Sequence, residues 1–406
     1  MRRSELILAV YLPTALLAMG QGLLLATLPF HATDLGARLT MVSVIVSAAA
    51  IGTLVTDVPA GALLHWIGLR RSMLIGSALV VVGTMSLALP LSAEAVVGFR
   101  LLAGVGTAMW GLSRHAFITQ SANLESRGRS IAVFGGINRI GMFAGPAAGG
   151  LVATAASTAA SFVVAGTMGL LAFIAAAAFI PRARNPAAVH VGEGRKRWDL
   201  VTETLRASSG DLTAAAVAQL FAQMIRQGRQ LLIPLVGATV IGLNPAEVGI
   251  VMTASAVLDM SMFIPAGILM DRFGRKFASV PSFTVMAIGI GMVPFAESFV
   301  ALLIAGLVIG LGNGLGSGTM MTLGADLAPE GATGEFLGIW RLIGDVGMVA
   351  GPLAVGLIAS SWGLTGSAMA LMVAGFLASG ILFFLVKETR IAPVGHSAEP
   401  METPGD

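Results

Sequence analysis

Twelve stretches of mostly apolar residues, each long enough to cross a membrane, make up most of this 406-residue chain. A membrane-spanning helix needs about 20 such residues to cross about 30 Å of hydrocarbon. Because lipid cannot hydrogen-bond the backbone, each crossing segment has to satisfy its own peptide groups, and a helix does so. We therefore expect an all-α integral membrane protein with twelve transmembrane helices. The predicted spans are residues 6–30, 40–64, 72–91, 95–120, 130–153, 160–180, 213–238, 246–270, 277–295, 299–324, 335–359 and 365–386.

The composition indicates a chain whose surroundings are mostly lipid. Hydrophobic residues make up 56% of it and charged residues 11%, which leaves too little polar surface for a water-soluble fold. The first apolar run is too long for a signal peptide, so we expect it to stay as the first helix. The absence of cysteine excludes disulfides, thiolate metal sites and a cysteine nucleophile.

The chain contains two copies of one unit, offset by 206 residues. Residues 58–71, VPAGALLHWIGLRR, and residues 264–276, IPAGILMDRFGRK, both run from an apolar segment through Pro-Ala-Gly into a basic end. Two equivalent halves that rock about a site between them are what a secondary transporter needs. The offset relates Gly61 to Gly267, Gly68 to Gly274, and Pro146 to Pro352.

The Lys and Arg residues in the connections predict the orientation of the helices. With both termini in the cytosol, most of the 24 Lys and Arg residues fall in inner connections, whereas the outer loops hold only Arg38. We therefore expect a plasma-membrane protein with both termini cytosolic. The expected parts are an N-terminal six-helix bundle at 1–180, a cytoplasmic linker at 181–212, a C-terminal six-helix bundle at 213–387 and a disordered cytoplasmic tail at 388–406.

The linker itself has two interpretations. Trp198, Val201 and Leu205 have the spacing of a short helix lying on the inner membrane surface. A solvated, charged linker explains the same residues equally well.

Short motifs occur in two loops and two spans. The loop after the eighth span reads G-x-L-x-D-R-x-G-R-K in full, and the loop after the second span matches it in part, with His65 where the second loop has an acidic residue. The fourth span contains Arg100 and Gly104 as R-x-x-x-G, and the fifth contains GMFAGPAAGG. The loop residues that match are Gly267, Leu269, Asp271, Arg272, Gly274, Arg275 and Lys276 in the second copy, and Gly61, Leu63, Gly68, Arg70 and Arg71 in the first.

These motifs resemble those of the major facilitator superfamily over about residues 6–386. The element in the fifth span is similar to one typical of the drug:proton antiporter branch. The resemblance implies two pseudo-symmetric six-helix bundles, the major facilitator fold, that work by alternating access. It also implies that the two signature loops form gates and that Asp271 helps to hold the inner gate shut, a role for which the neutral imidazole of His65 is poorly suited.

The fifth and eleventh spans contain glycine and proline at equivalent positions. Proline permits a bend in a helix, which a gate needs, and glycine lets two helices approach closely. Gating and packing explain the pattern about equally well. The residues concerned are Gly145, Pro146, Gly351 and Pro352.

Ionisable residues inside the predicted spans are the candidates for a functional site, because a charge in hydrocarbon is costly and usually faces a cavity or a partner. Arg114 and Asp57 lie toward the inner ends, where their side chains can reach water. Arg226, Asp259 and Asp345 lie near mid-span, where a functional role competes with a purely structural ion pair. The full set is Arg100, Arg114, Arg139, Arg226, Arg229, Arg341, Asp57, Asp259 and Asp345.

One face of the seventh span is polar. Its members recur at spacings of three and four residues, which places them in one line along a helix. A polar stripe of this kind cannot face lipid, so we expect it to line the substrate cavity together with Gln21 of the first span. The stripe consists of Gln219, Gln223, Arg226 and Gln230, with Arg229 beside it.

Asp345 is the leading candidate for proton coupling, and Asp259 is the second. A buried carboxylate beside an arginine changes its protonation when substrate displaces the arginine. Arg341 lies four residues before Asp345 on the same helix face, and Arg139 occupies the position equivalent to Asp345 in the other half. We therefore expect Arg341 to be its partner along the helix and Arg139 to be its partner across the cavity. Arg100 of the R-x-x-x-G element belongs to the same set.

No motif favours an enzyme. The chain lacks G-x-x-x-x-G-K, H-E-x-x-H and G-x-S-x-G sequences, so we expect neither nucleotide-driven transport nor hydrolysis, and no cofactor or metal. Contact with anionic lipid explains the basic inner loops without a nucleic acid partner.

The sequence thus predicts a secondary active transporter, and we expect a monomer that exports small neutral or anionic organic molecules by proton antiport. Uptake or exchange of an organic or phosphorylated anion is the alternative, because guanidinium groups suit carboxylates and phosphates. A membrane scaffold or receptor that transports nothing is disfavoured, since it has no need of charges in mid-span.

Overall fold

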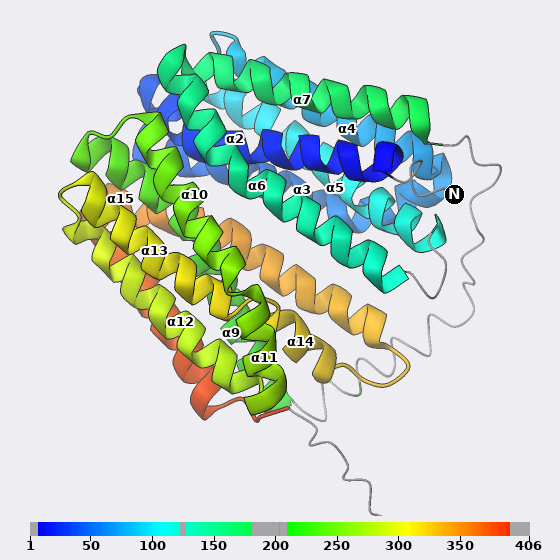
Figure 1. Cartoon of the computed structure of the whole chain (residues 1–406), viewed down its shortest axis with the longest axis vertical. Coiled ribbons are helices and arrows are strands. Elements are labelled where there is room, and N and C mark those ends of the chain that lie inside the picture. Colours follow the sequence, from blue (N-terminus) through cyan, green and yellow to red (C-terminus); the bar gives the residue numbers. More distant parts are fainter. Residues whose placement is uncertain (1–6, 122–126, 181–202, 204–208, 390–406) are drawn as a thin grey trace, which may run out of the picture.

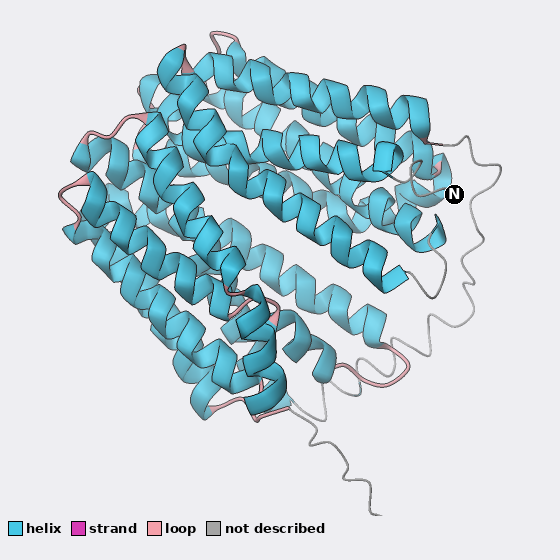
Figure 2. Ribbon diagram, viewed as in Figure 1, coloured by secondary structure: helices cyan, strands magenta, loops and turns pink. Residues whose placement is uncertain are grey.

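The computed structural model describes residues 7–121, 127–180, 203 and 209–389, and every regular element in these ranges is helical (Figure 2). The interfacial helix considered for the linker lies outside the described residues. The first half contains η1 (Ile7–Tyr11), α2 (Leu12–Asp34), α3 (Leu39–Ile67), α4 (Leu69–Met85), η2 (Ser86–Ala88), α5 (Ala93–Ser121), α6 (Arg127–Ala155) and α7 (Thr158–Phe179). The second contains α9 (Ser209–Val236), η5 (Gly237–Ile241), α10 (Pro245–Ser261), α11 (Phe263–Phe273), α12 (Arg275–Met292), η6 (Val293–Phe295), α13 (Phe299–Leu315), α14 (Thr319–Asp326) and α15 (Thr333–Phe384).

The helices form two bundles, with α2–α7 in one and α9–α15 in the other (Figure 1). Within the described ranges, eight helices are long and apolar enough to cross a membrane, and the bent pair α10–α11 makes a ninth. One of the eight, α15, contains two predicted spans that join at Gly363, where φ is 68°. The arginine- and glutamine-bearing helices α6 and α9 complete the set. The expected fold of twelve spans in two bundles is confirmed.

Several of the described helices begin with a side-chain cap. Ser157 accepts a hydrogen bond from the backbone N–H of Ala160 at the start of α7, and Ser298 does the same before α13. Asn244 and Glu247 form a reciprocal capping box at the start of α10. These caps satisfy N–H groups that have no partner within the helix and thereby fix where each span begins.

Two predicted spans are broken, although the hydropathy pattern predicts continuous helices. α10 and α11 meet at Met262 with a bend of 40°. α13 and α14 are separated by residues 316–318, where Gly318 has a left-handed φ of 80°, a conformation that strains other residues. By contrast, α6 and α15 stay helical through Pro146 and Pro352. The interruptions therefore fall on α10–α11 and α13–α14.

Equivalent glycines pack equivalent helix pairs. Gly145 of α6 lies against the backbone of Gly22 in α2, and Gly351 of α15 lies against the backbone of Gly228 in α9. Both contacts obey the 206-residue offset. A Cβ at either position would collide with the neighbouring backbone, so close packing explains these two glycines.

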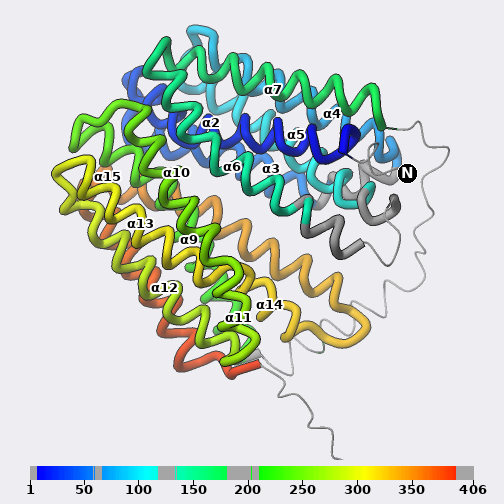
Figure 3. Tube along the Cα trace, in the orientation of Figure 1, coloured from blue at the N-terminus to red at the C-terminus, as the bar shows by residue number. Residues whose placement is uncertain are grey.

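The two bundles touch closely at one end. We call it the far end, because it lies opposite the linker end, where α7 stops and α9 starts. Thr253 of α10 donates to the carbonyl of Phe143 at 3.0 Å and accepts from the N–H of Ala147 at 3.1 Å, both in α6. A Cβ on Gly249 would collide with the carbonyl of Pro146. The bundles lie side by side there and diverge toward the linker end (Figure 3).

We expect Gly249→Val to weaken the far-end contact, because overpacking costs about 1–3 kcal/mol, a factor of about five or more in the ratio of two states. The change should raise the labelling rate of the buried reporter Ser47→Cys from the far side of sealed vesicles. Gly98→Val, at a position with open space for a Cβ, is the matched control. Equal labelling rates in both variants would show that this contact does not hold the far end closed.

Candidate functional site

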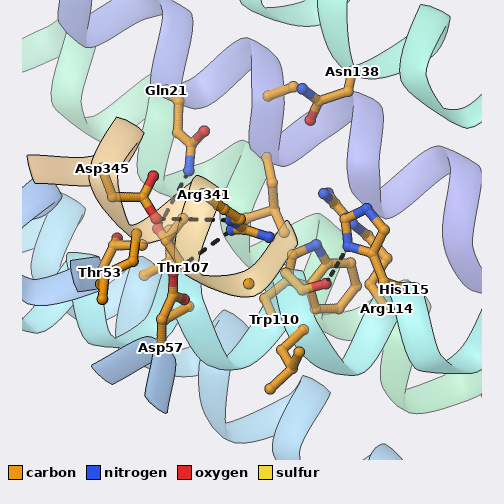
Figure 4. Close-up of a pocket in the computed structure, with 18 of the residues that line it drawn as sticks. Gln21, Thr53, Asp57, Thr107, Trp110, Arg114, His115, Asn138, Arg341 and Asp345 are labelled. Atoms are coloured by element: carbon orange, nitrogen blue, oxygen red, sulfur yellow. Dashed lines mark hydrogen bonds and ion pairs between the residues drawn. The ribbon is translucent and has the colours of Figure 1, made fainter. Parts of the chain in front are cut away.

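A cavity of about 620 Å³ lies between the two bundles and extends toward the linker end. Its walls come mainly from α2, α3, α5 and α6 of the first bundle and from α15 of the second. Figure 4 labels ten of its side chains, namely Gln21, Thr53, Asp57, Thr107, Trp110, Arg114, His115, Asn138, Arg341 and Asp345.

An arginine with two carboxylates joins the bundles inside this cavity. Arg341 of α15 lies 3.6 Å from Asp57 of α3, measured between Nη2 and Oδ2, and 3.7 Å from Asp345, measured between Nε and Oδ2. Both distances exceed those of a good hydrogen bond. The Arg341 side chain is 59% exposed, whereas those of Asp57 and Asp345 are about one-fifth exposed. Arg341 therefore forms two long ion pairs, and the pair with Asp57 joins the two bundles.

The pairing of Arg341 with Asp345 follows the four-residue spacing, whereas the pairing with Asp57 does not. In the sequence, Asp57 lies toward the inner end of its span, where its side chain is expected to reach water. Its contact with Arg341 depends on how the two bundles are rotated against each other, which no local pattern reveals.

The expected contact of Arg139 with Asp345 is absent from the described structure. Arg139 of α6 instead donates to the hydroxyl of Ser317 at 3.2 Å, and its guanidinium lies 4.2 Å from the ring centre of Phe263. The 206-residue offset makes Phe263 the equivalent of Asp57. Arg139 and Asp345 thus occupy equivalent places in their bundles and face different partners.

A buried polar network connects three helices of the second bundle. Arg226 of α9 donates to Oδ1 of Asn313 at 2.9 Å and to the carbonyl of Gly316 at 3.0 Å. Asn313 of α13 donates to Oδ2 of Asp259 in α10 at 2.6 Å, and Asp259 is only 2% exposed. The Arg226 guanidinium also lies 5.2 Å from the ring centre of Phe283. The network ends at the break between α13 and α14 and satisfies the carbonyl exposed there.

The first bundle has a neutral counterpart of this network. Gln21 of α2 donates to the hydroxyl of Thr107 in α5 at 3.3 Å, and Thr53 of α3 donates to the carbonyl of Gly104 in α5 at 3.1 Å. The 206-residue offset relates Thr107 to Asn313 and Thr53 to Asp259. Of the two equivalent sets, only the one in the second half is charged. A comparison of residues 206 positions apart in the sequence could have revealed this difference.

The polar stripe of α9 divides between packing and cavity. Gln219 is 5% exposed and lies against Gly344 of α15, and Gln223 contacts the same helix near Gly347. Gln230 lines a second cavity. Arg226 belongs to the buried network, and Arg229 donates to its carbonyl at 3.3 Å and lines a small cavity with Gln230.

The second cavity, of about 400 Å³, also lies between the bundles. It adjoins the first, because Gln21, Thr53 and Thr107 line both. Arg100 of α5 lines its wall from the first bundle. Gln227 of α9, which the stripe does not include, lines it from the other bundle and is the equivalent of Gln21 by the 206-residue offset.

The signature loops hold the last helix of their own bundle at the linker end. Arg70 donates to the carbonyls of Ile180 and Ala177 at 3.0 and 2.8 Å, and Lys276, its equivalent, donates to the carbonyl of Phe383 at 2.9 Å. Cations are favourable at such positions, because the last carbonyls of a helix lack partners and carry partial negative charge.

The second loop contains an additional carboxylate contact. Glu388 accepts from the backbone N–H groups of Arg275 and Lys276 at 2.8 and 3.0 Å, at the start of α12, where a carboxylate is favoured. Arg275 also forms an ion pair with Asp326 at 2.8 Å. Gly274, with a φ of 113°, makes this tight start possible.

Other residues of the loops lie at the surface. Arg71, Asp271 and Arg272 are exposed. Gly68 has a φ of 80° and marks the turn into α4, and Gly267 has open space around it. The surroundings of Gly61 are outside the described side chains.

The fold and the cavities define a membrane transporter built from two six-helix bundles rather than an enzyme. Two matches to the family model of the Major Facilitator Superfamily cover residues 10–226 and 215–403. The chain belongs to the Major Facilitator Superfamily.

The following relatives are distant in sequence. An uncharacterised MFS-type transporter of Methanocaldococcus jannaschii is 24% identical over 157 residues, which is 39% of each chain. The alignment thus spans well under half of that relative's length. A D-xylose–proton symporter superposes with a TM-score of 0.77 at 15% identity, covering 96% of this chain and 99% of the other. A bacterial homologue of the human lysosomal transporter Spinster, in an inward-facing and unoccupied conformation, gives 0.78 at 14% identity with the same coverage.

We expect Arg226→Gln to destabilise the protein by about 1–3 kcal/mol, because it leaves buried polar groups of the network without a partner. Thermal unfolding in detergent measures the effect. Arg229→Gln is the matched control, since it removes one long hydrogen bond to a backbone carbonyl. If Arg226→Gln unfolds at the wild-type temperature, the network does not support the fold.

Proposed function

We propose that this transporter exports small neutral or anionic organic molecules across the plasma membrane in exchange for protons. The observation that carries the proposal is the contact of Arg341 with Asp57 and Asp345 inside the cavity between the bundles. A proton on Asp57 weakens the ion pair that joins the bundles, and a proton on Asp345 leaves Arg341 to Asp57 alone, so protonation of either carboxylate changes the contact between the bundles. Proton binding and the rocking of the bundles are thereby linked.

The direction of transport is supported by two features of the sequence. The bias of Lys and Arg assigns the linker end, and both termini, to the cytosol. The cavity that extends toward the linker end then faces the cytosol, as an exporter requires when it loads substrate. The GMFAGPAAGG element in α6, similar to that of drug:proton antiporters, also favours export.

Asp259 is the second candidate for proton coupling. Its Oδ1 is buried and has no hydrogen-bond partner in the described structure. However, Asp259 and its partner Asn313 belong to the same bundle. In the described structure no ion pair joins Asp259 to the first bundle, whereas Asp345 shares Arg341 with Asp57 of the first bundle, so Asp345 ranks first.

We expect Asp345→Asn to abolish uphill transport driven by a pH gradient and to keep substrate exchange without a gradient. Asparagine keeps the shape of the carboxyl group and cannot release a proton. Counterflow and pH-driven accumulation in proteoliposomes, with a panel of neutral and anionic organic compounds, measure the two activities. Asp34→Asn, at an exposed position, is the matched control. Undiminished uphill transport in both Asp345→Asn and Asp259→Asn would remove the proposed coupling.

We expect Asp271→Asn to favour the state that is open at the linker end, because Asp271 is proposed to help close that end. The cavity residue Asn138, changed to cysteine, should then label faster from the linker side, and Ser47→Cys should label more slowly from the far side. Transport should fall while thermal stability stays near wild type. Unchanged labelling from both sides would contradict the gating role.

A further inference from the structure

The second cavity contains a cation and no acidic residue among those that line it. Arg100 enters from α5, about two helical turns from the far end of that helix. Within the described chain, no hydrogen bond or ion pair joins Arg100 to another residue, and its Nε is fully buried. The other wall supplies the amides of Gln227 and Gln230.

Arg100 differs in this respect from the other arginines of the mid-span region. Arg226 and Arg139 have hydrogen-bond acceptors, and Arg341 has two carboxylates. A guanidinium cannot lose its proton at physiological pH, so burial without an anion has to be compensated elsewhere. In a membrane-spanning segment such a group faces a partner or a water-filled path. In the described structure Arg100 borders a cavity whose lining contains no acidic residue, so an anion for Arg100 has to come from a bound molecule.

The rest of the cavity wall sets the kind of molecule that carries this anion. Its lining is largely apolar, with Leu24, Leu28 and Val46 from the first bundle and Met348 from the second. A cavity of about 400 Å³ is at the lower end of the range for small-ligand sites. The wall therefore suits a compact apolar body attached to one charged group.

We propose that Arg100 binds the carboxylate of a small organic monoanion, whose apolar body fills the second cavity and reaches the amides of Gln227 and Gln230. The planar guanidinium matches a carboxylate with two parallel hydrogen bonds. Because Arg100 and the two glutamines come from opposite bundles, the bound anion touches both. This inference rests on the proposed transport function and narrows its substrate from neutral or anionic to anionic. Export of a monoanion is also favoured by a membrane potential that is negative inside.

The first test uses stability without any ligand. If Arg100 has no counter-ion in the ligand-free protein, Arg100→Gln removes an uncompensated charge and should raise the melting temperature of the purified full-length protein. An arginine that supports the fold gives the opposite result. A lower melting temperature in Arg100→Gln would overturn the proposal.

The second test compares carboxylates with amides of the same shape. Benzoate and benzamide, and hexanoate and hexanamide, are titrated against the protein in detergent by the shift in melting temperature. We expect each carboxylate to bind wild type at least about tenfold more tightly than its amide, since a charge-assisted hydrogen bond is worth more than a neutral one. Arg100→Gln should abolish this difference, and Arg100→Lys should keep part of it, because lysine keeps the charge without the planar geometry.

Two controls separate the possible outcomes. Arg38→Gln removes a cation from an exposed position and should bind both carboxylates as wild type does. Phenyl phosphate tests a dianion, which should bind more weakly than benzoate because a single guanidinium faces the cavity.

Equal binding of carboxylates and amides by wild type, or tighter binding of phenyl phosphate, would overturn the assignment. Carboxylate binding that depends on Arg100, in a protein that shows no pH-driven transport, would instead refute the proposed coupling and leave the anion site standing.

Discussion

The cost of placing a charge within a membrane-spanning bundle governs most of this structure. Apolar side chains gain little from packing against each other when lipid is the alternative, so close helix contacts and satisfied polar groups have to hold the bundles. Every charge in a span then needs a partner or a cavity. Three of the described arginines follow this rule in different ways. Arg226 donates hydrogen bonds to two acceptors, Arg341 pairs with two carboxylates, and Arg100 borders a cavity.

The two halves have the same helix plan and divide the chemistry unequally. The offset of 206 residues relates Thr107 to Asn313 and Thr53 to Asp259, so a neutral set of side chains in the first bundle becomes a charged network in the second. The charged network ties α9, α10 and α13 together beside two helix breaks. The first bundle, with smaller polar groups at these positions, contributes most of the lining of both cavities. One half is thus the more internally bonded, and the other offers more of the binding surface.

The sequence predicted the spans, the two-bundle fold and the pairing of Arg341 with Asp345, because hydropathy and helical spacing are local properties. It did not predict which residues meet between bundles. Arg139 was expected beside Asp345 from their equivalent positions, but equivalence relates places in two separate bundles and does not bring them together. The contact of Asp57 with Arg341 and the bend at Met262 likewise depend on tertiary packing. The sequence predicted that the polar stripe on α9 lies inside the protein. Only the packed structure shows that Gln219 contacts α15 whereas Gln230 lines a cavity.

Protonation of Asp345 is proposed to change how the two bundles sit together. The distance between spin labels at the linker end tests it most directly, with one label at Val133 on α6 and the other at Thr333 on α15, both exposed. The chain has no native cysteine, so two introduced cysteines take the labels without background. We expect the distance distribution of wild type to shift with pH, and Asp345→Asn to show the low-pH distribution at every pH. A pH-dependent shift that persists in Asp345→Asn would contradict the proposal.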